Sequence, residues 1–186
     1  MNLCQQASRS WLGGSVGVGG AVEVGDSVEG AGSADRDPHD AGDRSASIPT
    51  VPIALAERII EGARYEAKRL GLRLAFAVVD GGGNLVAAAR DDGAQLGAMS
   101  LAHDKAYTAA AFGMPTSAWV ASSQPGGSDW GLAGTLGGRA IVFPGGVPVL
   151  THGQLAGGLG VSGTASTVDE QCAKAGLRHA GLETAE

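Results

Sequence analysis

The segment from Leu72 to Asp80, LRLAFAVVD, places the strongest constraint on the fold, because it is apolar on both faces. Every second residue from Leu72 to Val78 is a bulky apolar residue, as one face of a β-strand requires. The intervening positions from Ala75 to Val79 are apolar as well. A strand of this kind must be covered on both sides. We therefore expect a helix layer, a partner subunit or both to cover the two faces of the central strands.

The rest of the pattern predicts an α+β fold with a five-stranded antiparallel sheet flanked by helices. The turn Gly81-Gly82-Gly83-Asn84 predicts a hairpin that continues into a second strand at Leu85–Arg90. Further strands are expected at Arg139–Phe143, Val147–Leu150 and Leu155–Val161. Apolar periodicity, helix-forming composition and end signals predict helices at Pro52–Leu70, Ala94–Phe112, Ser117–Ser122 and from Thr167 to about Gly181.

The first 47 residues differ in composition from the rest of the chain. They hold nine glycines, seven acidic and three basic residues, and no run of bulky apolar residues. This composition predicts a disordered tail at residues 1–47 and one folded domain at residues 48–186. The tail carries −4 of the formal charge of −6, so the domain is nearly neutral and no nucleic-acid partner is expected.

The location prediction follows from what the sequence does not contain. No apolar run reaches the roughly 20 residues that a membrane span needs. The N-terminal stretch has no apolar core typical of a secretion signal. The two cysteines, Cys4 and Cys172, suggest neither a disulfide framework nor a zinc site. We therefore expect a cytoplasmic protein with no membrane partner.

The segment Gly158-Leu-Gly160-Val-Ser-Gly163 satisfies the GxGxxG pattern of dinucleotide-binding sites. A Rossmann unit needs a second parallel strand after the following helix, and the printed chain leaves no room for one. The glycines are better explained by close packing near the end of a strand.

His103 is the first candidate site residue. Met99 and Tyr107 lie four residues to either side of it, so the three form one stripe on the predicted helix. Such a stripe can meet a flat aromatic ligand, and His103 could bind a metal there. The alternative is a partly exposed or core histidine without a ligand.

Three further candidates carry a charge or a hydroxyl group. Lys105 lies about 200° around the helix from His103, on an otherwise apolar face. It therefore needs an anion, either a ligand carboxylate or an acid such as Asp80 or Asp91. Arg90, at the end of an almost uncharged strand, could bind a ligand or pair with Asp91 or Asp92. Thr116 could cap the short helix or face a ligand.

Three segments together resemble the GlcG/HbpS-like haem-binding family, also found as the C-terminal domain of PduO-type proteins. They are AFAVVDGGGNLVAAARDDGA (75–94), SLAHDKAYTAAAFGMPT (100–116) and PGGVPVLTHGQLAGGLGVSGTASTVDEQCAKAGL (144–177). The resemblance covers Pro52 to Leu182 and implies a profilin-like α+β domain. It also implies a homo-oligomer, from dimers to octamers.

The resemblance implies binding of haem or a related tetrapyrrole, and haem degradation in some members. Arg90, Lys105 and Thr116 coincide with residues that recur in the family. His103 lies at a position that varies in the family, so its candidacy comes from this sequence alone.

Our leading hypothesis is a small-molecule-binding protein for haem. Thr116, His103 or Tyr107 would lie near the iron, and Arg90 or Lys105 would bind the propionates. The first alternative is a lyase that acts on an aromatic acid, such as a hydroxylaminobenzoate lyase. In that enzyme Arg90 or Lys105 would bind the carboxylate, and His103 or Tyr107 would move protons. The second alternative is a scaffold subunit without catalysis.

Overall fold

The computed structural model describes residues 49–184 of the chain. The predicted disordered tail, residues 1–47, lies outside the described residues, as do Cys4 and His39. Within residues 49–184, no helix has the length and apolar character needed to cross a bilayer.

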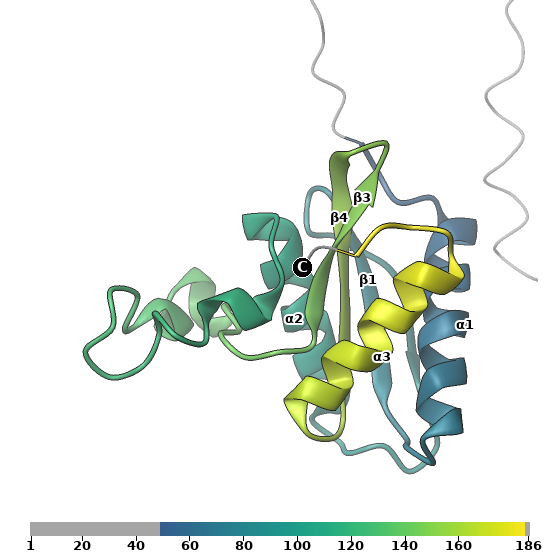
Figure 1. Cartoon of the computed structure of the whole chain (residues 1–186), viewed down its shortest axis with the longest axis horizontal. Coiled ribbons are helices and arrows are strands. Elements are labelled where there is room, and N and C mark those ends of the chain that lie inside the picture. Colours follow the sequence, from purple (N-terminus) through teal and green to yellow (C-terminus); the bar gives the residue numbers. More distant parts are fainter. Residues whose placement is uncertain (1–48, 185–186) are drawn as a thin grey trace, which may run out of the picture. The chain divides into compact units, whose positions relative to one another are not determined.

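The described residues form an α+β fold (Figure 1), as the sequence predicted. Four antiparallel strands make one sheet with the spatial order β2-β1-β4-β3. The strands are β1 (Ala75–Asp80), β2 (Leu85–Arg90), β3 (Gly146–Thr151) and β4 (Gln154–Ser162), and the helices are α1 (Ile53–Arg69), α2 (Ala98–Phe112) and α3 (Ser166–His179). Three short 3₁₀ turns, η2 (Thr116–Trp119), η3 (Leu132–Gly134) and η4 (Leu136–Gly138), lie between α2 and β3.

The prediction of a fifth strand at Arg139–Phe143 was wrong, because this segment bonds to side chains of α2 instead of to a neighbouring strand. The Ile141 amide donates to Oγ1 of Thr108 at 3.0 Å, and the Arg139 carbonyl accepts from the same hydroxyl at 3.1 Å. The free edge of β3 is also closed to pairing near its start. There the Gly146 amide donates to Thr116, and Pro148, two residues on, has no N–H to offer.

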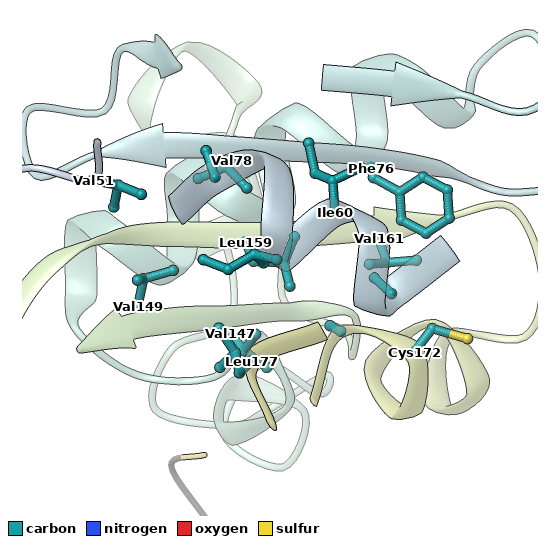
Figure 2. Packing of buried hydrophobic residues seen from close by; sticks show 14 of the residues in the cluster. Val51, Ile60, Phe76, Val78, Val147, Val149, Leu159, Val161, Cys172 and Leu177 are labelled. Carbon is teal, nitrogen blue, oxygen red and sulfur yellow. The ribbon is translucent and has the colours of Figure 1, made fainter. Parts of the chain in front are cut away.

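Strand β1 is buried on both faces, as its sequence predicted. Phe76 and Val78 pack into the main core with residues of α1 and α3 (Figure 2). On the other face, Ala75 and Ala77 pack against α2. The two covering layers are therefore helices of this chain. The main core draws on both helices and on three strands, with Ile59, Ala63, Phe76, Val78, Val147, Val149, Leu159, Val161, Ala173 and Leu177 among its members.

Glycines in β4 allow α2 to lie directly on the sheet. A Cβ atom built on Gly160 would collide with the Ala102 carbonyl, and one on Gly158 would collide with the Ala106 carbonyl. This confirms close packing as the explanation of the GxGxxG-like segment. The alanines on the sheet-facing side of α2 are fully buried for the same reason.

We expect Gly160→Ala to lower the free energy of unfolding by at least the roughly 1–3 kcal/mol typical of overpacking, because helix backbone blocks the new methyl group. Urea denaturation followed by circular dichroism measures this change. Gly97→Ala is the control, since nothing lies within 4 Å of its Cβ position and its φ of −75° suits alanine. Equal stability of the two variants would show that α2 does not rest on the β4 backbone.

Candidate functional site

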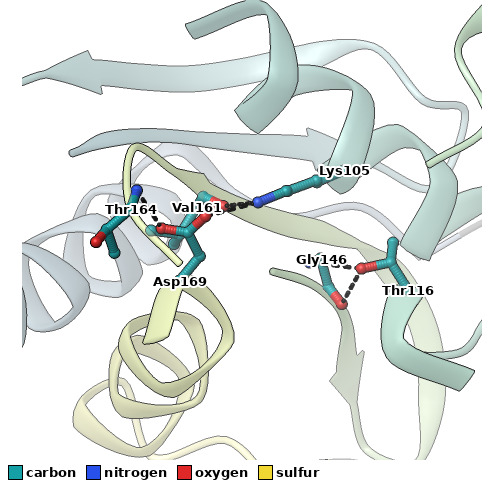
Figure 3. A network of polar contacts seen from close by, with 6 residues as sticks. All are labelled: Lys105, Thr116, Gly146, Val161, Thr164 and Asp169. Carbon is teal, nitrogen blue, oxygen red and sulfur yellow. Dashed lines mark hydrogen bonds and ion pairs between the residues drawn. The ribbon is translucent and has the colours of Figure 1, made fainter. Parts of the chain in front are cut away.

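Helix α2 presents two flanks with different surroundings, and Lys105 lies on the buried one. Its Nζ donates to Oδ2 of Asp169 at 2.8 Å and to the Val161 carbonyl at 2.9 Å (Figure 3). The other carboxylate oxygen, Asp169 Oδ1, accepts from the Thr164 amide at 3.1 Å. The two side chains are only 1% and 2% exposed. The pair therefore joins α2 to the first turn of α3 inside the protein.

Burial affects both members of this ion pair. It lowers the pKa of the Lys105 ammonium and raises the pKa of the Asp169 carboxyl, because each charged form has lost its water. The hydrogen bond between the two groups opposes both pKa shifts.

Lys105 does need an anion, as predicted, but the anion is Asp169. The expected partners, Asp80 and Asp91, are engaged elsewhere. Asp80 accepts from the Asn84 amide at 2.8 Å, and Asp91 pairs with Arg64 at 2.9 Å. No local pattern links positions 105 and 169. The one available signal was an acidic residue in the first turn of the predicted last helix.

Thr116 is fully buried beside the same flank. Its Oγ1 accepts from the Gly146 amide at 2.9 Å and so attaches η2 to the start of β3 (Figure 3). The expected capping role was wrong, since Pro115 precedes η2 and no side chain caps it. Gly145 and Gly146 approach this region so closely that a Cβ on Gly145 would lie 2.5 Å from Lys105 Nζ. Lys105 and Thr116 thus support the fold from within.

The opposite flank of α2 faces β2 and carries the predicted stripe. Helix α2 runs in the same direction as β1, because Ala98 and Ala102 pack on the start of β1 and Ala106 packs on Val79 near its end. Met99 packs against Ala75 and Ala77 at the start of β1. The Tyr107 ring contacts the position of Gly83 in the hairpin turn at the other end. His103 lies between them, one helical turn from each.

Strand β2 brings Arg90 to this flank. Its residues Arg90, Ala88 and Leu85 pair with Ala75, Ala77 and Val79 of β1, so they share the sheet face that α2 covers. Helix α2 packs on β4, β1 and β3 but barely reaches β2, which leaves these three residues exposed. We call Leu85, Ala88, Arg90, Met99, His103 and Tyr107 the β2 flank.

Two features of the β2 flank bear on chemistry. The His103 Nε2 atom is buried and has no hydrogen-bond partner among residues 49–184. The Tyr107 ring is covered by Arg139, whose guanidinium carbon lies 3.8 Å from the ring centroid. Sequence reasoning missed Arg139, which was assigned to a strand. Within the described residues Arg90 forms no ion pair, and Asp91, one of its expected partners, binds Arg64.

The structure therefore places Arg90, His103 and Tyr107 along one flank of α2, with Arg90 at the start of β1 and Tyr107 at the hairpin turn, and places Lys105 and Thr116 apart from them. Three surface pockets of ≈ 540, ≈ 400 and ≈ 350 Å³ lie beside α1 or α3, and no predicted site residue lines them. The described residues contain no cluster of three or more histidine, cysteine or acidic side chains that could hold a bare metal ion.

We expect Lys105→Met to destabilise the protein by about 3–5 kcal/mol, because it leaves the Asp169 carboxylate buried without a partner. Adding Asp169→Asn should recover part of this loss, since the buried group is then uncharged. Lys68→Met on the exposed surface of α1 is the control and should change stability by less than about 0.5 kcal/mol. Thermal or urea unfolding measures the stability of all three variants. A Lys105→Met variant as stable as the unmodified protein would contradict a structural role for the pair.

Comparison with known proteins agrees with this architecture. Residues 51–178 match the family model described as haem degrading protein HbpS-like. An uncharacterized 15.0 kDa protein of Citrobacter freundii is 33% identical over 134 residues, which is 72% of this chain and 94% of that protein. The corrinoid adenosyltransferase PduO of Salmonella typhimurium is 31% identical over 70% of this chain, but the match spans only 40% of PduO.

Solved structures give the same assignment. The Klebsiella pneumoniae protein ORFY superposes with a TM-score of 0.73 at 31% identity, over 76% of this chain and 98% of ORFY. A complex of PduOC with heme gives 0.68 at 27% identity, over 73% of this chain and 97% of PduOC. HbpS gives 0.68 at 28% identity, over 74% of this chain and 94% of HbpS. The family model and these relatives together show that the chain belongs to the haem-degrading, HbpS-like family.

Proposed function

We propose that this protein binds haem, or a similar flat tetrapyrrole, on the β2 flank of α2. The single observation that carries the proposal is the buried Nε2 of His103, which has no partner among residues 49–184. An unpaired buried nitrogen costs free energy, and a ligand that binds it after the covering side chains move aside would remove this cost. Membership of the HbpS-like family and the PduOC–heme complex support haem as that ligand.

The residues of the β2 flank fit such a ligand. Neutral imidazole is a common ligand of haem iron, so His103 would be the first candidate to hold the iron, with the Tyr107 hydroxyl as the second candidate. The Arg90 guanidinium is exposed and can pair with a propionate. Met99 and Ala88 offer apolar contact to the ring. Bound haem would supply an iron centre, while the chain's residues bind and orient it and limit access of water.

Lys105 and Thr116 take an indirect role in this proposal. The ion pair with Asp169 and the bond to Gly146 already use their polar atoms. We propose that they fix the position of α2, and through it the position of His103, without touching the ligand.

Several finer properties that the family resemblance leads us to expect belong to the same proposal. We propose that the protein degrades the haem that it binds, which loss of the bound-haem absorption with ascorbate in air would test. We also propose a profilin-like homo-oligomer, from dimer to octamer, that works in the cytoplasm.

An enzyme acting on a small aromatic acid is the second candidate function. The presence of Arg90, His103 and Tyr107 on one flank favours it, because Arg90 can bind a carboxylate and the other two can move protons. Release of ammonia from a hydroxylaminobenzoate would support this lyase. A scaffold subunit, the third hypothesis, would bind neither class of ligand.

We expect haemin to bind with a saturable band in the Soret region. His103→Ala should shift that band, and Arg90→Ala should weaken binding about tenfold, as loss of one charge-assisted hydrogen bond would. Absorption titration of the purified full chain measures both effects.

His179→Ala and Arg58→Ala are the matched controls, because both side chains are exposed and lie on α3 and α1. Equal, saturable binding by all four variants would show that the haem site lies elsewhere on the protein. Binding that never saturates in the unmodified protein would contradict the haem proposal itself.

A further inference from the structure

Residues 117–138, here called the arm, pack very little against the rest of the protein. Of these residues only Ser123 is buried. Figure 1 shows the arm, in green, projecting away from α2 and the sheet. It exposes 64% of Trp130, 44% of Leu136 and 38% of Val120. An exposed apolar segment of this kind marks an interaction surface.

The arm is nearly free of charge. Asp129 is the one side chain in the arm that carries a charge at neutral pH. A partner surface must therefore be mainly apolar and nearly neutral, because burying unpaired charges against the arm would be unfavourable.

The chain itself carries a surface of this kind on the β2 flank. Leu85 is 53% exposed there, Ala88 is exposed beside it, and Arg90 is the one permanently charged residue. The outer surfaces of α1 and α3 are different, since they carry many charged side chains, among them Glu57, Arg58, Glu61, Arg64, Lys68, Lys174 and Arg178.

The arm and the β2 flank lie at opposite edges of the sheet. The root of the arm is fixed to β3 by the Thr116–Gly146 hydrogen bond and to α2 by the edge-to-face contact of Trp119 with Phe112, 5.0 Å between centroids. Strand β2 is the far edge in the order β2-β1-β4-β3. The arm projects beyond α2 and away from the sheet (Figure 1), and Arg139, directly after it, reaches back to Tyr107 of the same chain. A second copy can bring Trp130 and Leu136 to Leu85 and Ala88.

We propose that the arm of one copy packs on the β2 flank of a second copy, head to tail. Trp130 and Leu136 would cover Leu85 and Ala88, and in the ligand-free oligomer Asp129 has the charge to pair with Arg90 of the partner subunit. Because the two surfaces differ, repetition of this contact forms a ring where the rotation between copies closes and an open filament where it does not. The inference rests on the proposed self-association and goes beyond it by naming the two surfaces. It also makes the proposed ligand site a site between subunits.

The test compares molecular mass in solution, by light scattering after size exclusion, over a range of concentrations. We expect the unmodified full chain to form an oligomer. Trp130→Ser on the arm and Ala88→Glu on the flank should each reduce the mass to that of smaller species or the monomer. Tyr65→Ser is the control, because this residue of α1 is 70% exposed and lies on neither surface. Circular dichroism checks that every variant is folded.

Mixing the two variants tests the head-to-tail geometry. Each variant keeps one intact surface, so an equimolar mixture should form a heterodimer that neither variant forms alone. A mixture that stays monomeric would overturn the head-to-tail contact. An oligomer unaffected by either variant would overturn the arm contact while leaving self-association intact, and a monomeric unmodified chain would overturn both.

Discussion

The buried ion pair between Lys105 and Asp169 is the interaction on which the arrangement of the helices depends. It connects α2, on one face of the sheet, with α3, on the other, around the end of β4. Together with the glycines of β4, it fixes both the distance of α2 from the sheet and its rotation. That rotation turns His103 and Tyr107 toward β2. The orientation of His103 and Tyr107 on the β2 flank therefore depends on the packing of Lys105 on the opposite flank of α2.

This division explains why residues that look equally suited to binding have different roles. Lysine and threonine side chains near a ligand site and inside a core have the same sequence signature. Here the polar atoms of Lys105 and Thr116 already bond to partners inside the protein. In contrast, Arg90 is exposed, and His103 has a buried nitrogen without a partner among residues 49–184. The proposed haem site uses the second group and depends on the first for its shape.

Much of the fold could be predicted because its signals are local. The doubly apolar strand Ala75–Asp80, the glycine turn after it and the helices on either side all came from short-range patterns. The stripe of Met99, His103 and Tyr107 was predicted in the same way. The separation of Lys105 from His103 followed from helix geometry alone.

The errors came from long-range contacts. Arg139–Phe143 has the composition of a strand, but Thr108 on α2 takes its backbone bonds. Asp169 could not be identified as the partner of Lys105, because 64 residues separate the two. Only the folded chain brings such groups together, so no window of sequence could have shown them.

The most direct test of this account is an NMR spectrum of the histidine and lysine side chains, recorded on ¹⁵N-labelled protein as ferric haemin is added. The account predicts that the unpaired electrons of the iron broaden the His103 imidazole signals first and strongly. The Lys105 ammonium signal should remain in place, protected by Asp169. Loss of the Lys105 signal with an unperturbed His103 would contradict the account, because the ligand would then occupy the flank that we assign to structure.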